Sequence, residues 1–305
     1  MKKIKLLVIS IILFSQLCNA QKNIVVVDKE TNEPIPFASL KFTDSEKGIY
    51  TNEKGVFSLE NIKTDSLEIS YLGYKTQIVL TTNITDTLKL VPKPTVLSEV
   101  FLTTEKPKLE LIGYSKKSKN MSWFMQPKQE LTTLINIPVE SNKAYVSKIH
   151  IPIGKHLYVN KNDKTKRVKP DFNSVFRLHL YSNKNNQPNE RLLKIPLLVY
   201  CNQDSKKMQM INIEDKKIIY PKEGLFVGVE MIGNVDENGY IIETKVNRSP
   251  PTFKFTKRAK GDIKSYTRFM FSKTNEWHEI DPKLSFNKKI QYHMAVGLTI
   301  ATYKE

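Results

Sequence analysis

Residues Thr31–Glu60 read TNEPIPFASLKFTDSEKGIYTNEKGVFSLE, in which two acidic turn signals, TNEP and TNEKG, surround short runs of apolar residues. In the run from Ala38 to Phe42, apolar and polar residues alternate. A period of two places the apolar side chains on one face of a β-strand. Similar runs, separated by turn residues, extend from Asn23 to Val91. The pattern predicts an antiparallel β-sandwich.

The turn residues of this segment have structural roles that their chemistry explains. Pro34 can fix the backbone of the turn before Ile35, and Asn52 supplies a side-chain acceptor in the turn NEKG. Gly55 follows where a positive φ is needed, and Gly73 lies between two tyrosines where a strand bends or bulges. None of these positions requires a catalytic role.

The order of these residues resembles the carboxypeptidase regulatory-like domain, a transthyretin-like β-sandwich, in the form found in the cell envelope of Bacteroidetes. The motifs that carry the resemblance are, in chain order, Asp28, Pro34-Ile35, Ala38, Leu40, Gly48, Thr51-Asn52, Gly55, Phe57, Leu59, Leu67, Ile69-Ser70-Tyr71 and Gly73-Tyr74. The first strand departs from the family pattern, because Asn23-Ile24-Val25 stands where Gly-x-Val is usual. The resemblance implies an accessory module without catalytic residues, which indicates location better than activity.

The first twenty residues have the three-part layout of a secretory signal peptide. Lys2, Lys3 and Lys5 precede an apolar run from Leu6 to Phe14, and SQLCNA follows before Gln21. The apolar run is shorter than the roughly 20 residues that span a bilayer. We therefore expect export to the periplasm, the outer membrane or the cell surface. Lipidation of Cys18 is an alternative to cleavage after Ala20.

Removal of residues 1–20 leaves one cysteine, Cys201, which cannot form an intramolecular disulfide. Stability must then come from packed cores. Cys201 ends the apolar run IPLLVYC, which favours a buried thiol that packs as a small hydrophobic group; a reactive nucleophile is the alternative.

Charge divides the chain into two parts. Residues 21–92 hold 8 Lys against 10 Asp and Glu, whereas residues 93–305 carry +16 of the chain's net +17. We expect a signal peptide at 1–20, a regulatory-like sandwich at 21–92, a Pro- and Lys-rich linker and lead-in at 93–142, and a basic sandwich domain at 143–305. The last part is too short for a plug and a large barrel, which disfavours a transporter.

Strand-like runs return after Lys143, separated by loops of Asn, Asp, Gly and Pro. Alternation is clearest in Val175–Ser182, which reads VFRLHLYS. One face of that run is predicted to hold Phe176, Leu178 and Leu180, and the other Arg177, His179 and Tyr181. The chain is therefore predicted to be all-β, a transthyretin-like sandwich followed by a larger, jelly-roll-like one.

Motifs of known chemistry are missing from the sequence. None of its five histidines has Glu three residues later, and neither HExxH nor GxSxG occurs. We expect no metal, no cofactor and no enzymatic activity. His278, in EWHEID, is the exception to weigh, since Glu276, Glu279 and Asp281 could support acid/base chemistry. A solvated turn is the other interpretation.

Six residues are candidates for ligand binding. Exposed indoles can stack on sugar rings, but an indole that anchors its loop to the sandwich is the alternative. Basic groups in the runs KTKRVK and FKFTKRAK can hold anions, and solvated loops are the alternative there. The candidates are Trp123, Lys166, Arg167, Arg258, Trp277 and His278. Export argues against nucleic acid as the partner. An anionic glycan or an envelope protein is expected instead, with peripheral association at the outer membrane.

The leading hypothesis is an exported, non-enzymatic cell-envelope protein that serves as an accessory or binding module for a glycan or protein partner. Two alternatives stay open. One is an accessory subunit of an outer-membrane uptake or secretion assembly, and the other is an unrecognised hydrolase in the C-terminal domain.

Overall fold

The computed structural model describes residues 23–60, 62–94, 106–114, 120–140, 144–161, 164–242, 250–256, 264–280 and 292–303, without the side chains of 120–121 and 158–165. The expected leader with Cys18, and the candidate Arg258, lie outside these ranges. Regular structure in them is β-strand, apart from two short 3₁₀ turns, η1 (Thr81–Asn83) and η2 (Glu214–Lys216). The all-β prediction is confirmed. Within the described ranges no helix has the length and apolar character needed to cross a membrane.

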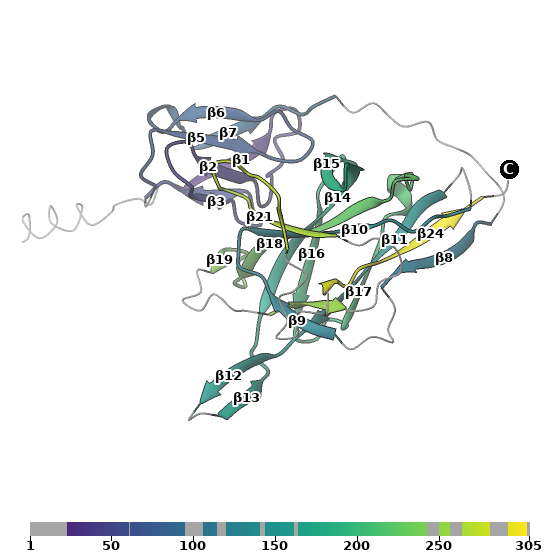
Figure 1. The fold of residues 1–305 in the computed structure, drawn as a ribbon. Coiled ribbons are helices and arrows are strands. Elements are labelled where there is room, and N and C mark those ends of the chain that lie inside the picture. The colour runs from purple at the N-terminus through teal and green to yellow at the C-terminus, as the bar shows by residue number, and fades with distance from the viewer. Residues whose placement is uncertain are drawn as a thin grey trace, which may run out of the picture.

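The first sandwich consists of a three-stranded and a four-stranded sheet (Figure 1). The sheet β4-β1-β7 is formed by β1 (Asn23–Asp28), β4 (Val56–Ser58) and β7 (Thr87–Leu90). The sheet β3-β2-β5-β6 is formed by β2 (Ser39–Phe42), β3 (Gly48–Tyr50), β5 (Ser66–Ser70) and β6 (Gln77–Leu80). Among the strands of the described ranges, β1 and β7 alone pair in parallel. Strands β3 and β4 each lie at an edge, joined by the turn that carries Asn52.

Gly55 and Asn52 stabilise the turn between β3 and β4 as predicted. Gly55 has a φ of 73°, and a Cβ there would lie 2.8 Å from the Val26 carbonyl oxygen. The Asn52 Oδ1 accepts hydrogen bonds from the backbone N–H groups of Lys54 and Val56. Alternate apolar residues of β2 and β5 are buried in one core. The sandwich is thus held by its own packing and by turn residues that suit each bend.

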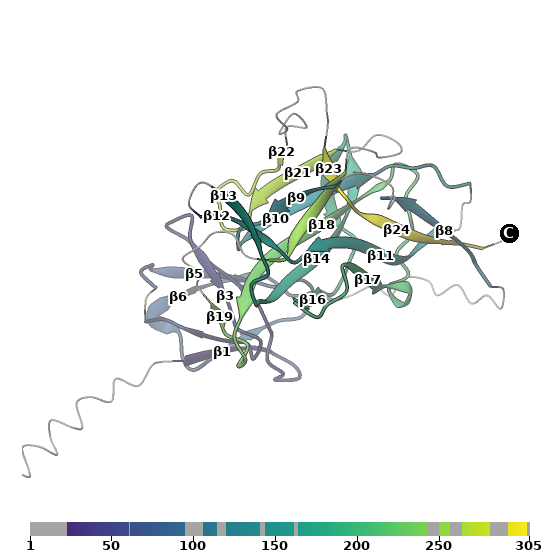
Figure 2. The same ribbon diagram turned by 90° about the horizontal axis from the view of Figure 1, so that it is seen from below.

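The larger part of the chain forms an eight-stranded and a seven-stranded sheet (Figures 1 and 2). The first follows the order β15-β14-β18-β10-β21-β22, with β16 on β14 and β19 on β18; the second follows β23-β20-β11-β24-β8, with β17 on β11 and β9 on β20. Their strands are β8 (Lys108–Gly113), β9 (Asn120–Phe124), β10 (Gln129–Ile135), β11 (Ala144–Gly154), β14 (Asn173–Lys184), β15 (Gln187–Arg191), β16 (Leu197–Asn202), β17 (Met208–Asn212), β18 (Leu225–Val235), β19 (Ile241–Ile242), β20 (Thr252–Thr256), β21 (Ser265–Phe269), β22 (His278–Glu279), β23 (His293–Met294) and β24 (Gly297–Thr302). A separate hairpin, β12 (Leu157–Lys161) and β13 (Lys164–Val168), projects from the body (Figure 1).

The linker predicted for 93–142 needs correction. Strands β8, β9 and β10 lie within it and pair with strands from the end of the chain. Every residue of β10 is buried, although Gln129, Glu130 and two threonines give the strand a polar sequence. The sequence of β10 did not indicate a buried strand, because the groups that pair with its polar residues come from distant parts of the chain.

The two large sheets enclose one core. Phe176, Leu178 and Leu180 of β14 are buried in it with side chains from both sheets, as the alternation predicted. Cys201 is also there, 1% exposed, which confirms the predicted burial of the thiol, and burial raises its pKa to about 12. Residues 217–221, whose sequence KIIYP is as apolar as that of a strand, form none of the strands and make an isolated bridge between Tyr145 and Ile219.

The outer face of the eight-stranded sheet is covered in part by the first sandwich. Phe37 and Tyr50 of that sandwich pack in a cluster with Val175 and Ile232 of the sheet and with Phe271 of the turn after β21. The ring centroids of Tyr50 and Phe271 lie 5.2 Å apart. Residues that the alternation placed on a polar face are therefore buried under another part of the same chain.

Candidate functional site: a buried charge layer and the groove beside it

A row of polar side chains lies between the eight-stranded sheet and the first sandwich. Glu230 of β18 is fully buried, and its carboxylate accepts hydrogen bonds from Arg177 Nη1 at 3.2–3.3 Å and from His179 Nε2 at 2.6 Å. The hydroxyl of Tyr50, from the first sandwich, donates to Glu230 Oε1 at 2.8 Å. One carboxylate of β18 thus joins groups from two other strands, β14 and β3.

A second carboxylate stands directly opposite. Glu130 of β10 is the register partner of Glu230, so both side chains lie on the same face of the sheet. Glu130 is also fully buried, and it accepts hydrogen bonds from Arg268 at 2.7 and 2.9 Å and from the Tyr181 hydroxyl at 2.7 Å. Each buried carboxylate therefore has its own arginine and its own tyrosine, which is the arrangement that makes buried charge tolerable.

Burial and these partners shift the titration of the layer. Burial acts to raise the pKa of Glu230, but Arg177, His179 and Tyr50 outweigh it and hold that pKa well below its ordinary value. Burial lowers the pKa of His179, so the imidazole is neutral at pH 7 and donates from Nε2. Burial, followed by the charge of Glu230, raises the pKa of Tyr50. The carboxylate stays ionised and the two neutral groups serve as its donors.

Further contacts fix the first sandwich on the sheet. The Arg177 Nη2 donates to the backbone carbonyl of Phe37, and Lys41 Nζ donates to the carbonyl of Ser272 at 2.9 Å. The backbone N–H of Glu53 donates to the carbonyl of Gly239 at 3.1 Å. A Cβ at Gly239, whose φ is 79°, would lie 2.6 Å from the Glu53 Cβ, so the close approach requires glycine.

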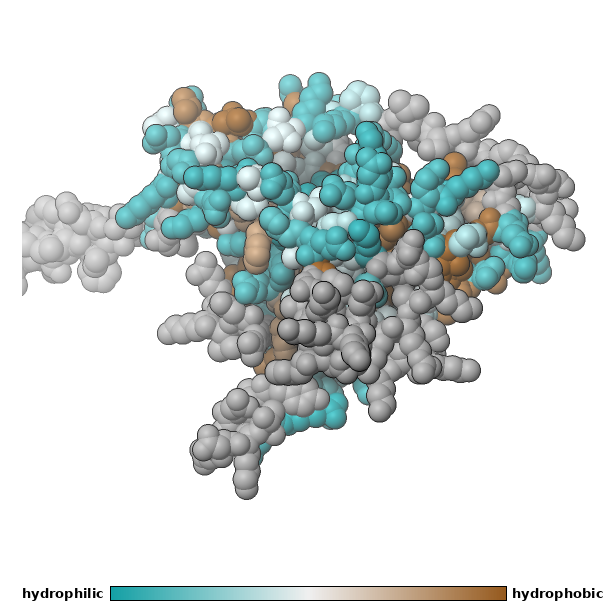
Figure 3. Space-filling model, viewed as in Figure 1, coloured by the Kyte–Doolittle hydropathy of each residue, from teal (hydrophilic) through white to brown (hydrophobic). Residues whose placement is uncertain are grey.

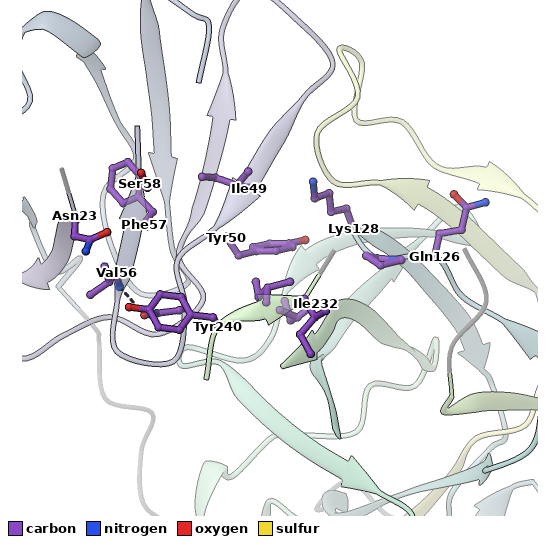
Figure 4. A pocket seen from close by; sticks show the side chains of 14 residues that line it. Asn23, Ile49, Tyr50, Val56, Phe57, Ser58, Gln126, Lys128, Ile232 and Tyr240 are labelled. Carbon is purple, nitrogen blue, oxygen red and sulfur yellow. Dashed lines mark hydrogen bonds between the residues drawn. The ribbon is translucent and has the colours of Figure 1, made fainter. Parts of the chain in front are cut away.

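An elongated groove runs beside this interface. It consists of two adjoining cavities of about 530 and 600 Å³ that share Ile49, Ser58, Gln126, Pro127 and Lys128. Figure 4 shows Ile49 and Tyr50 on one wall, Lys128 and Gln126 on the facing wall, and Tyr240 beside Val56. Phe42, Phe269 and Phe271 line the adjoining cavity.

The most accessible aromatic ring of the first cavity is held by its own turn. Tyr240 is 46% exposed. Its backbone N–H donates to Asp236 Oδ1 at 2.9 Å, and its carbonyl accepts from the Asp236 N–H. The contact between Gly239 and Glu53 anchors the same turn to the first sandwich. The ring is thus placed at the groove by a rigid backbone.

Trp277 and His278, two of the predicted ligand residues, have different environments. Trp277 is half-buried; the Arg268 guanidinium lies 4.0 Å from the centroid of its ring, and Tyr181 packs edge-on against it. It therefore anchors its loop to the buried layer. His278 and Glu279 form the exposed edge strand β22, and Glu276 before it is also exposed. This acidic segment is therefore solvated, although its second half is a strand and not a turn.

The remaining candidates lie apart from the groove. Trp123 is half-buried and packs on Phe255 with centroids 5.4 Å apart. Lys166 and Arg167 are exposed on the projecting hairpin, where an Arg167 nitrogen lies 3.2 Å from His156 Nδ1. The structure brings none of the described candidates together into one site. Within the described ranges no group of three His, Cys, Asp or Glu could hold a metal ion.

Sequence reasoning missed the buried layer and the groove. A usable signal existed, because Glu230 and Glu130 each interrupt a strand run, GLFVGVEMIG and QELTTLINI. A carboxylate inside such a run must find a partner or neutralise. The groove has no comparable signal, since its walls come from segments that are far apart in the chain.

Comparison with known proteins identifies the first sandwich only. No curated protein matches the chain. Among solved structures, a clostridial cysteine protease, Cwp84 after propeptide cleavage, aligns at a TM-score of 0.39 and 11% identity over 65% of this chain and 42% of that one. The cysteine protease and lectin-like domains of Cwp84, a surface layer associated protein of Clostridium difficile, align at a TM-score of 0.34 and 10% identity over 60% and 36%. This chain thus spans less than half of either relative. The CarboxypepD_reg-like domain family matches residues 25–102, and that part of the chain belongs to the carboxypeptidase regulatory-like domains.

Proposed function

We propose that this chain is an exported, non-enzymatic binding protein of the cell envelope and that its ligand, a glycan segment, occupies the groove between the two sandwiches. The elongated groove is the observation that carries this proposal. Two adjoining cavities of about 530 and 600 Å³ suit a chain-like ligand better than a single compact one.

The lining of the groove supports a sugar ligand. Sugars present apolar faces that stack on aromatic rings and hydroxyls that pair with amides. Tyr240 offers an accessible ring, and Asn23 and Gln126 offer amide groups in the same cavity. The adjoining cavity holds Glu46 and Glu60 as well as two lysines, so its own charges balance. The groove therefore fits an uncharged stretch of a glycan.

Attraction of an anionic glycan would come from the rest of the molecule. Residues 93–305 carry a net charge of +16, which raises the local concentration of polyanions at moderate salt. The hairpin residues Lys166 and Arg167 are exposed and contribute to this field. Export and attachment at the envelope are part of the proposal and rest on the leader expected at residues 1–20.

The non-enzymatic role is supported by how the carboxylates are used. Glu130 and Glu230 are fully buried and engaged by arginines, and Glu230 also joins the sheet to the first sandwich through Tyr50. The exposed segment around His278 lines neither cavity of the groove. These contacts assign the acidic groups to structure and solvent, and they leave recognition to the aromatic and amide groups.

Binding of purified envelope glycans, measured by array and isothermal titration, tests the proposal. Tyr240→Ala is expected to weaken binding about fivefold or more, because a stacked ring contributes about 1 kcal/mol. Tyr145→Ala, on the outer face of the seven-stranded sheet, serves as the control and should leave affinity unchanged. Lack of binding to every glycan, or equal effects of the two variants, would reject the groove as a glycan site. Binding of peptides alone would indicate a protein partner instead.

A further inference from the structure

Strand β8 (Lys108–Gly113) forms an open edge of the seven-stranded sheet. It pairs with β24, and no other described strand pairs with it. The Tyr114 N–H donates to the Val296 carbonyl, which continues the same register. Because hydrogen-bonded pairs alternate in an antiparallel ladder, Ile112 and Glu110 bond toward β24, whereas the backbone groups of Leu111 and Leu109 point to the open side.

Two of the exposed side chains of this edge are apolar, whereas a protected edge strand usually carries charged residues or proline. Leu109 and Leu111 are 55% and 58% exposed, while Ile112 is buried in the core. Figure 3 shows apolar surface gathered in the region of β24 and β8. Natural sheets usually protect their edges with charge, proline or a covering loop, and an open apolar edge tends to pair with another strand.

We propose that β8 pairs antiparallel with β8 of a second copy of this chain, in a two-fold register centred on Leu109. In that register Lys108 of each copy stands opposite Glu110 of the other. The two leucines at position 109 exchange their backbone N–H···O bonds. Lys108 and Glu110 then form a pair of the close type, without backbone bonds between them, in which side chains approach nearest.

Charge selects this register over its neighbours. A two-fold axis at Glu110 would place two Glu110 carboxylates opposite each other, which is destabilising. An axis at Leu111 would place Glu110 opposite the apolar Ile112. Only the axis at Leu109 pairs both charges, and it also lets the Leu111 N–H donate to the carbonyl of Pro107, whose ring lacks an N–H. The sequence Lys108-Leu109-Glu110 is thus complementary to itself.

A second open edge provides an internal comparison. Strand β6 lies at the edge of the four-stranded sheet, and its Ile78 and Leu80 are 65% and 53% exposed. Its sequence, QIVL, contains no charged residue and so cannot form cross-strand ion pairs with a copy of itself. The proposal therefore assigns self-association to β8 and leaves β6 as the matched control.

Sedimentation velocity of the purified protein over a wide concentration range tests the dimer. The sedimenting mass should rise from that of a monomer to that of a dimer as the protein concentration increases. Lys108→Glu and Glu110→Lys should each raise the dissociation constant about tenfold or more by placing like charges opposite each other, and the double variant Lys108→Glu/Glu110→Lys should restore it. Ile78→Lys should have no effect. A monomer at every concentration, or a double variant no better than the single ones, would overturn the proposal.

A cysteine pair fixes the register independently. In the expected mature protein from Gln21, Cys201 is buried and unreactive, so an introduced thiol is the reactive one. Leu109→Cys places two thiols at the two-fold axis, with Cα atoms about 5.5 Å apart, within disulfide range. Leu111→Cys places them roughly 13 Å apart along the strands. Mild oxidation should link the first variant and not the second, and the reverse result would refute the register.

Discussion

The two faces of strand β14 differ in chemistry but not in burial. Phe176, Leu178 and Leu180 are 0% exposed on one face, and Arg177, His179 and Tyr181 are 4%, 1% and 2% exposed on the other. The apolar face needs only to be packed. The polar face needs a partner for each donor and charge, and those partners include Tyr50 and the Phe37 carbonyl from the first sandwich. Alternation therefore predicts which residues share a face, but not whether that face meets water.

The comparison also separates stability from specificity. Burying apolar groups stabilises a fold in proportion to area. A buried ion pair gains little over an apolar pair of the same volume, but it is strongly destabilising when only one partner remains. We therefore regard the charge layer, formed by Glu230, Glu130 and their hydrogen-bond donors, as the feature that fixes the position of the first sandwich on the sheet.

Removing one buried charge should have the largest effect. Glu230→Gln leaves the Arg177 guanidinium buried without its carboxylate, and we expect it to lower the free energy of unfolding by about 3–5 kcal/mol. Leu178→Ala, on the opposite face of the sheet, should lower it by about 2–5 kcal/mol through the cavity that it leaves. Urea unfolding measures both. An effect of Glu230→Gln below about 1 kcal/mol would mean that the polar face tolerates an unpaired charge.

Acid should weaken the polar face selectively. The pKa of His179 lies below its ordinary 6.5 and that of Glu230 below its ordinary 4.5, so the unfolded chain takes up protons that the native state does not. The free energy of unfolding should therefore fall as the pH falls through 6.5 and again through 4.5. The charges that act on His179 are Glu130, Glu230 and Arg191.

His179→Gln isolates the upper part of this pH dependence. The amide can still donate to Glu230 but does not titrate, so the loss of stability between neutral pH and about pH 5 should become shallower. The loss of stability at lower pH, which comes from protonation of Glu230, should remain. His293, whose pKa burial also lowers, supplies a residual slope and the control variant His293→Gln. An unchanged profile for His179→Gln would show that this imidazole titrates equally in both states.

Loss of a single hydrogen bond across the interface should have a smaller effect. Tyr50→Phe removes the hydroxyl that donates to Glu230 and keeps the packing against Phe271. We expect the free energy of unfolding to fall by about 1–2 kcal/mol, because Glu230 keeps its other donors. A double-mutant cycle with Glu230→Gln should give a coupling of similar size. If the effects of the two mutations on the free energy of unfolding were strictly additive, Tyr50 and Glu230 would not interact energetically.

The smallest effect is expected at His278, one of the candidate ligand residues of the sequence. His278 is exposed, so His278→Ala should change the free energy of unfolding by less than about 0.5 kcal/mol and leave glycan binding intact. Lost glycan binding, or loss of a hydrolase activity, in this variant would indicate that the segment around His278 has a functional role.

Much of the fold was predictable because it depends on local patterns. The runs of the first sandwich became strands, Gly55 adopted a positive φ, and β14 presented the two predicted faces. The failures have one physical cause. Strand β10 and the pairs of Glu130 and Glu230 depend on groups distant in the chain, as do the walls of the groove. Trp277 anchors its loop on Arg268, which is one of the two interpretations that the sequence left open, because the sequence does not show which partner an indole meets.

Calorimetric unfolding tests the central claim, that the charge layer joins the two sandwiches into one cooperative unit. We predict a single transition whose calorimetric enthalpy equals the van't Hoff enthalpy, with Tyr50→Phe shifting that transition as a whole. Two separate transitions, with Tyr50→Phe affecting neither, would contradict it.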